Sequence, residues 1–96
     1  MIKNGGGGIF QIIDGPAKSP YSKTFFAPFD AKIKGICEAF GLDHMEVSSE
    51  SELLDSFAEF YAFSKSNRPK LMVIDTSSCQ NAELLKDYFG ALKSLN

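Results

Sequence analysis

The chain has 96 residues, of which 44 % are hydrophobic and 23 % charged, with a formal net charge of −2. This length allows one small domain at most. The weak negative charge argues against a nucleic-acid binder that depends on neutralising phosphates, and no apolar run is long enough to span a bilayer or act as a signal peptide. Cys37 and Cys79 are too few and too irregularly placed for a disulfide framework or a zinc site. We therefore expect reduced thiols in a cytoplasmic protein.

The N-terminal stretch combines an asparagine, four consecutive glycines and an apolar segment. Asn4 precedes Gly5–Gly8, and Ile9–Ile13 follows. An asparagine side chain offers a neutral oxygen that suits a hard cation such as Mg²⁺. If the glycines lead from a strand that ends near Ile2 into the first turn of a short helix, their N–H groups converge on a bound anion. The pattern therefore favours a cradle for a metal-bound diphosphate.

A flexible glycine linker is the alternative interpretation of this stretch. Phe10 and Gln11 stand where the dinucleotide-binding motif would need its last glycine, and the P-loop motif is also missing. A linker, however, would not run directly into so apolar a segment as residues 9–13. We keep the cradle as our interpretation.

The middle of the chain is expected to hold a long connection followed by a helix. Asp14-Gly15-Pro16 interrupts the first helical segment, because proline disfavours helix in the residue before it. Residues 17–28 form a long connection whose aromatic side chains pack as a satellite core or belong to a lid over a cofactor pocket. Asp30 is a candidate N-cap for a helix that closes at Gly41. The predicted buried face of this helix consists of Ile33, Ile36, Cys37 and Phe40.

The second half of the chain alternates strands and helices. Residues 44–47 and 71–74 are predicted strands, the latter covered on both faces. Ser49-Glu50-Ser51-Glu52 is a capping box, which predicts a helix that ends at Asn67-Arg68-Pro69, and residues 80–94 predict a last helix. The predicted buried faces of these two helices are Leu54, Phe57, Ala58 and Tyr61, and Leu84, Leu85, Tyr88 and Leu92. This order predicts an α/β fold with a small parallel sheet, whose unpaired edges another copy of the chain would cover.

The sequence contains no other group of residues with the spacing typical of a catalytic site. His44 is expected to be structural or exposed. Asp75 follows a strand, where sites of α/β proteins lie, but it has no identifiable partner and is interpreted as a cap or turn residue. The acidic residues of the predicted helices are interpreted as solvated faces.

The motif Asn4-Gly-Gly-Gly-Gly-Ile9-Phe10, with Ile12-Ile13 after it, resembles the second half of the thiamine-diphosphate motif of the SEPHCHC synthases of menaquinone biosynthesis. Weaker matches follow at Phe25–Pro28, Ala39–Leu42, Leu71–Ile74 and Asn81–Leu84. The resemblance implies that residues 1–96 are a single partial domain, the C-terminal part of a three-layer α/β/α thiamine-diphosphate-binding domain. The complete enzyme would be a cytoplasmic homo-oligomer that uses thiamine diphosphate and Mg²⁺. It would decarboxylate 2-oxoglutarate and add the product to isochorismate.

The resemblance also implies roles for individual residues. Mg²⁺ would be bound by the side-chain oxygen of Asn4 and the backbone carbonyl of Gly6. The cofactor-binding residues would be Gly6, Gly7, Gly8 and Ile9. Phe10 and Ile13 would line the substrate pocket, where an apolar wall desolvates the reacting centre. The chain departs from the family at Lys3, where the family has asparagine, and at Phe29, where it has histidine.

No catalytic residue of the family falls within the chain. It lacks the Gly-Asp-Gly segment whose aspartate binds the metal, the glutamate that activates the cofactor, and the arginines that hold substrate carboxylates. We therefore expect the chain alone to be inactive. Two alternatives stay open: a segment of another thiamine-diphosphate enzyme, such as an acetolactate synthase, and a non-catalytic α/β domain that self-associates through its open sheet edges.

Overall fold

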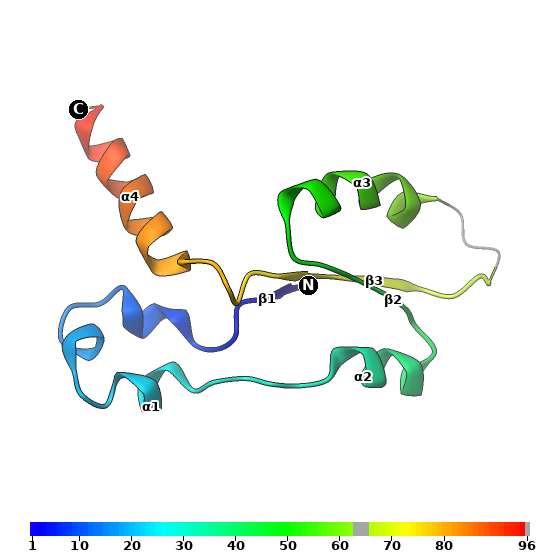
Figure 1. Cartoon of the computed structure of the whole chain (residues 1–96), viewed down its shortest axis with the longest axis horizontal. Helices are drawn as coiled ribbons and strands as arrows, with labels where there is room; N and C mark the ends of the chain where they lie inside the picture. Colours follow the sequence, from blue (N-terminus) through cyan, green and yellow to red (C-terminus); the bar gives the residue numbers. More distant parts are fainter. Residues whose placement is uncertain (63–65, 96) are drawn as a thin grey trace. The chain divides into compact units, whose positions relative to one another are not determined.

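The computed structural model describes residues 1–62 and 66–95. Its elements, in chain order, are β1 (Ile2–Lys3), the 3₁₀ helices η1 (Gly8–Gln11) and η2 (Pro16–Lys18), α1 (Ser22–Phe26), α2 (Ile33–Phe40), β2 (Asp43–Val47), α3 (Glu50–Tyr61), β3 (Lys70–Asp75) and α4 (Asn81–Ser94). Figure 1 shows this order from blue to red. The expected strands and the last helix are confirmed, and the short helix after the glycines is a 3₁₀ helix.

The chain divides into two compact units. The first, which we call the sheet unit, contains Met1–Lys3 and Asp30–Thr76. The second, which we call the loop unit, contains Asn4–Phe29 and Ser77–Asn96. The single partial domain implied by the family resemblance stays a prediction.

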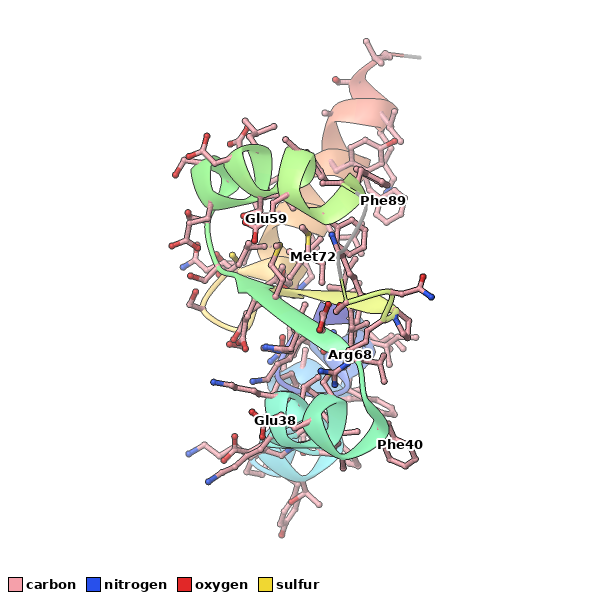
Figure 2. All side chains as sticks on the ribbon, turned by 90° about the vertical axis from the view of Figure 1, so that its right-hand side faces the viewer. Glu38, Phe40, Glu59, Arg68, Met72 and Phe89 are labelled. Carbon is pink, nitrogen blue, oxygen red and sulfur yellow. The ribbon has the colours of Figure 1, made fainter. Side chains whose placement is uncertain are left out.

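The sheet unit is built on three parallel strands in the order β1-β3-β2. Ile2 pairs with Ile74 and Lys3 with Asp75, while β2 runs along β3 from the pair Asp43–Lys70 to the pair Val47–Ile74. Within this unit α2 and α3 lie on opposite sides of the sheet, as both views show (Figures 1 and 2). The predicted small α/β fold with a parallel sheet is therefore confirmed.

Local sequence signals explain several of these boundaries. Gly41 closes α2 in the left-handed conformation, with φ 72° and ψ 32°, as expected. Ser49 caps α3, since its hydroxyl accepts a hydrogen bond from the Glu52 amide at 3.3 Å. None of the helices in residues 1–62 and 66–95 has the length and apolar character needed to cross a membrane.

Three boundary predictions were wrong. The N-cap of α2 is Lys32 and not Asp30, so the helix starts later than its polar start signal. Helix α3 ends at Tyr61, before the Asn67-Arg68-Pro69 turn; residues 63–65 lie outside the described part of the chain. The long connection of residues 17–28 contains α1 and part of η2, because local i to i+3 hydrogen bonds such as Thr24 N–H to the Tyr21 carbonyl organise it.

The core is small and lies entirely in the sheet unit. Among the described residues the buried apolar side chains are Cys37, Val47, Met72 and Val73. Residues 72 and 73 belong to β3, the central strand, which confirms the prediction that this strand is covered on both faces.

Most of the predicted helix faces are not buried. On the predicted face of α2 Cys37 is buried and Ile33 is half-buried, while Ile36 and Phe40 are 50 % and 79 % exposed. The exposed residues predicted as core on the other helices are Leu54, Phe57, Ala58, Tyr61, Leu84, Leu85, Tyr88 and Leu92. The 3.6-residue period identifies the apolar face of a helix but not the surface that covers it, which is why these predictions failed.

Candidate functional site

The candidate site is residues 4–8, which we call the glycine loop. Along the chain this loop starts directly after β1, whose last residue, Lys3, pairs with Asp75, the last residue of β3. It therefore follows the carboxyl end of a parallel strand, which is where binding sites of α/β proteins form. The loop leads into η1, which begins at Gly8.

Lys3 has a partner that the sequence did not reveal. Its Nζ atom lies 3.8 Å from the Asp75 Oδ2 atom, and both side chains are about one-fifth exposed, at 19 % and 21 %. The interpretation of Asp75 as a residue without a partner was therefore wrong, because parallel pairing of β1 with β3 sets the two side chains side by side. The Lys3 ammonium group is thus turned toward a carboxylate.

Asn4 forms a tight turn with the glycine two residues later. Its Oδ1 atom accepts a hydrogen bond from the Gly6 amide at 3.2 Å. Such a side-chain turn orients the amide oxygen. An amide oxygen has two lone pairs, so this bond leaves one of them for a cation.

Backbone hydrogen bonds tie the glycine loop to the residues after α1. The Gly7 amide donates to the Phe26 carbonyl at 2.6 Å, and the Phe29 amide donates to the Gly5 carbonyl at 2.8 Å. Together with the Asn4 bond, they hold three successive residues of the loop. Phe26 and Phe29 could not be recognised from the sequence as partners of the loop, since main-chain groups carry no sequence signal.

Two of the glycines are required by geometry. Gly5 has φ +83°, which side chains rarely adopt, and a Cβ atom on it would lie 3.2 Å from the Ser77 Cβ atom. A Cβ atom on Gly6 would lie 2.7 Å from the Phe26 carbonyl oxygen and 2.8 Å from its ring, which real structures essentially exclude. A Cβ atom on Gly8, in contrast, would meet only the Asn4 side chain, at 3.8 Å.

The apolar residues after the loop lie at the surface of the loop unit. Ile9 is 60 % exposed, Phe10 39 % and Ile13 46 %. The Phe10 ring packs 5.7 Å from the Phe25 ring, and the Lys86 ammonium donates to the Gln11 carbonyl at 3.1 Å, which joins α4 to η1. These side chains therefore do not form a core.

The oxygen donors of the loop fit a hard cation. They are neutral amide and peptide oxygens, the ligand type that Mg²⁺ accepts, and they sit in a fold where a Cβ atom on Gly6 has no room. Within residues 1–62 and 66–95, no group of three or more His, Cys, Asp or Glu side chains is placed to hold a metal. The ligands that the glycine loop could offer to a metal are therefore neutral oxygens without a carboxylate.

His44 plays no part in this loop. Its side chain, in β2, is 13 % exposed, and its Nε2 atom lies 3.6 Å from the Glu46 Oε2 atom. This position agrees with the expected structural role.

The chain is similar to curated enzymes over nearly its whole length. It is 37 % identical over 95 residues to the 2-succinyl-5-enolpyruvyl-6-hydroxy-3-cyclohexene-1-carboxylate (SEPHCHC) synthase of Christiangramia forsetii, which covers 98 % of the chain and 16 % of that protein. It is 33 % identical over 90 residues to the synthase of the same name from Porphyromonas gingivalis, covering 93 % of the chain and 15 % of that protein. With the Phocaeicola vulgatus synthase the identity is 31 % over 97 residues, covering 100 % of the chain and 17 % of that protein.

The chain thus spans about a sixth of the length of these curated relatives. No protein-family model matches it, and no solved structure matches it either.

Proposed function

Because the chain belongs to the SEPHCHC synthase family, we propose that it contributes part of the magnesium-diphosphate site of a thiamine-diphosphate-dependent synthase. The complete enzyme, a transferase, decarboxylates 2-oxoglutarate and joins the product to isochorismate. The chain corresponds to the C-terminal part of the cofactor-binding domain. The observation that carries the proposal is the Asn4 oxygen held against the Gly6 amide at the start of a glycine loop, in a chain of this family.

In this proposal the loop binds the metal and the diphosphate through different groups. The Asn4 side-chain oxygen and the Gly6 carbonyl bind Mg²⁺. Gly8 and Ile9 offer the first amides of η1, which have no acceptor within the helix and suit phosphate oxygens. The Gly7 amide already donates to Phe26, so Gly7 contributes close approach of the backbone.

The neighbouring residues shape the surroundings of the cofactor. Phe10 and Ile13, both exposed, form part of an apolar wall that excludes water from the reacting carbon. Thiamine diphosphate, when bound, supplies the electron sink for decarboxylation and for carbon–carbon bond formation. The charge of Lys3, the residue before Asn4 in the chain, is compensated by Asp75.

Metal binding by Asn4 can be tested with a matched pair of variants. Asn4→Ala removes the oxygen, whereas Asn4→Asp keeps an acceptor for the Gly6 amide and adds a charge. We expect Mn²⁺, titrated with thiamine diphosphate into the chain, to broaden the NMR signals of the glycine loop. Broadening should weaken in the alanine variant and strengthen in the aspartate variant. Equal broadening in all three proteins would contradict the role of Asn4.

The isolated chain is expected to show no 2-oxoglutarate decarboxylation with Mg²⁺ and thiamine diphosphate. The groups that activate the cofactor and hold the substrate have no counterpart in it. Release of carbon dioxide can be followed with and without isochorismate. Robust turnover by the chain alone would show that its site is complete and would overturn the partial-site proposal.

A non-catalytic, self-associating domain is the second candidate. The exposed apolar side chains favour it, including Tyr61 at 77 % and Leu95 at 80 % exposure. A homo-oligomer that buries them would sediment faster as concentration rises, and Leu95→Lys would reduce this effect. A monomer at all concentrations would exclude self-association of this chain.

A further inference from the structure

We propose that residues 26–29, here named the backing segment, position the Gly6 carbonyl so that it points toward the metal. This inference rests on the proposed function, because it assigns these residues a role toward the metal ligands of the glycine loop. The backing segment touches no metal in this proposal. It acts through two backbone hydrogen bonds and one close steric fit, all of them within the loop unit.

The first hydrogen bond sets the direction of the Gly6 carbonyl. In a trans peptide, the carbonyl of one residue and the N–H of the next point in opposite directions, and the described chain has no cis peptide bond. The Gly7 N–H points at the Phe26 carbonyl, 2.6 Å away. The Gly6 carbonyl must therefore point away from the backing segment.

The second hydrogen bond fixes the preceding peptide in the same way. Its carbonyl, on Gly5, accepts from the Phe29 amide at 2.8 Å, and its N–H, on Gly6, donates to the Asn4 Oδ1 atom at 3.2 Å. This peptide is thus held at both ends. The two oxygens assigned to Mg²⁺ are oriented by amides of successive peptides, and the backing segment holds both of these peptides.

The steric fit keeps the loop pressed against the backing segment. The Gly6 position has no room for a Cβ atom because the Phe26 and Ala27 carbonyl oxygens lie 2.7 and 3.0 Å from it. Ala27 itself adopts φ 48° and ψ 73°, a left-handed conformation that non-glycine residues seldom take. Ala27 is the C-cap of α1 and lies between Phe26 and Phe29, so we expect both hydrogen bonds of the backing segment to depend on its conformation.

Partners that orient metal ligands are a recurring part of metal sites, and their loss lowers metal affinity by roughly 10- to 100-fold. Two features of the backing segment can be changed by substitution: the Ala27 conformation and the Phe29 amide. Ala27→Val introduces a β-branched side chain that disfavours the left-handed conformation, whereas Ala27→Gly permits it. Phe29→Pro deletes the amide donor, whereas Phe29→Leu keeps it.

The experiment uses the 96-residue chain, labelled with ¹⁵N, and Mn²⁺ with inorganic pyrophosphate as the probe. Hydrogen exchange at the Gly7 and Phe29 amides reports the two bonds, and Mn²⁺-induced broadening at Asn4 and Gly6 reports metal affinity. We expect Ala27→Val and Phe29→Pro to lose exchange protection at Gly7 and to bind Mn²⁺ about 10-fold more weakly or worse. Ala27→Gly and Phe29→Leu should match the parent chain in both measurements.

The remaining outcomes distinguish failure of the positioning inference from failure of the proposed function. If the valine and proline variants lose protection but keep the Mn²⁺ affinity, the backing segment is structural and the positioning inference is wrong, while the proposed function stands. If the parent chain shows no Mn²⁺ broadening at Asn4 and Gly6, the proposed function fails, and this inference fails with it. The amides of α4, which belongs to the loop unit, serve as the folding control, and if Ala27→Val loses their dispersion, Phe29→Pro decides the result.

Discussion

Different forces stabilise the sheet unit and the loop unit internally. Every buried apolar side chain of the described residues belongs to the sheet unit, with Val73 at 0 % exposure. In the described part of the loop unit no residue is buried, and its contacts include main-chain hydrogen bonds, the Asn4–Gly6 bond, the Phe10–Phe25 ring pair and the Lys86–Gln11 bond. We therefore infer that removal of apolar surface from water mainly stabilises the sheet unit, whereas hydrogen bonds contribute more to the loop unit.

This difference predicts which substitutions destabilise each unit. Burial of a large apolar side chain contributes about 1.5–3 kcal/mol, so a core with so few members leaves little reserve. Loss of one hydrogen bond from the glycine loop costs less stability, about 0.5–1.5 kcal/mol. The proposed metal binding, however, depends on the direction in which the backbone groups of the loop point. The following substitutions separate the two kinds of stabilisation.

Val73→Asp should have the largest effect. It sets an unpaired carboxylate at a fully buried position of the central strand, which costs about 3 kcal/mol or more. Chemical denaturation followed by circular dichroism should show loss of the cooperative transition. The control is Leu54→Asp on α3, at a position that is 61 % exposed, with a change below about 1 kcal/mol. Equal effects at both positions would mean that the sheet unit has no defined core.

Gly5→Ala should destabilise the loop unit by about 1–3 kcal/mol. The new side chain would have to adopt φ +83° and would lie 3.2 Å from the Ser77 Cβ atom. Gly15 is the matched control, because it has φ +98° but nothing within 4 Å of its added Cβ atom. Gly15→Ala therefore carries the backbone strain alone. Hydrogen-exchange rates of the loop amides measure the destabilisation in both variants. An equal loss of exchange protection in the two variants would show that the Ser77 contact is unimportant.

Short-range signals in the sequence predicted much of the sheet unit. The capping box predicted the Ser49 cap of α3, and the apolar run 71–74 predicted a central strand covered on both faces. Both signals describe groups that lie close together in the chain or alternate along one element. The helix faces failed because their burial depends on which other surfaces are present, as Phe40 at 79 % exposure shows.

The sequence predicted the position of the glycine loop but not the contacts that hold it. Its position after β1 followed from an apolar residue before the glycines. The Lys3–Asp75 pair and the Phe26 and Phe29 bonds could not be foreseen, since they join residues distant in sequence, and the bonds use backbone groups common to all residues. A run of glycines indicates that something approaches closely; the approaching group here includes the Phe26 carbonyl.

Gly35→Ala and Gly90→Ala should each stabilise their own unit by about 1 kcal/mol. Gly35 lies in α2 of the sheet unit and Gly90 in α4 of the loop unit, and a Cβ atom on either would meet nothing within 4 Å. Alanine restricts the unfolded chain without a clash. Amide exchange should slow in α2 for the first variant and in α4 for the second. Slowing of both helices by either substitution would show that the two units unfold together, and faster exchange would mean that the helices depend on glycine.

The smallest effect is expected from pH, and it is confined to the sheet unit. Hydrogen bonds from the Ser48 amide and hydroxyl to the Glu52 carboxylate, at 2.8 and 3.2 Å, lower the pKa of Glu52 below its ordinary value of 4.5. Because the folded pKa is the lower one, the carboxylate stabilises the start of α3 above pH 4.5, and this contribution is lost as the pH falls through the folded pKa. Exchange at the first amides of α3 should quicken over that interval in the parent chain and stay independent of it in Glu52→Gln. A Glu52 carboxyl that titrates at or above 4.5 by NMR would contradict these hydrogen bonds.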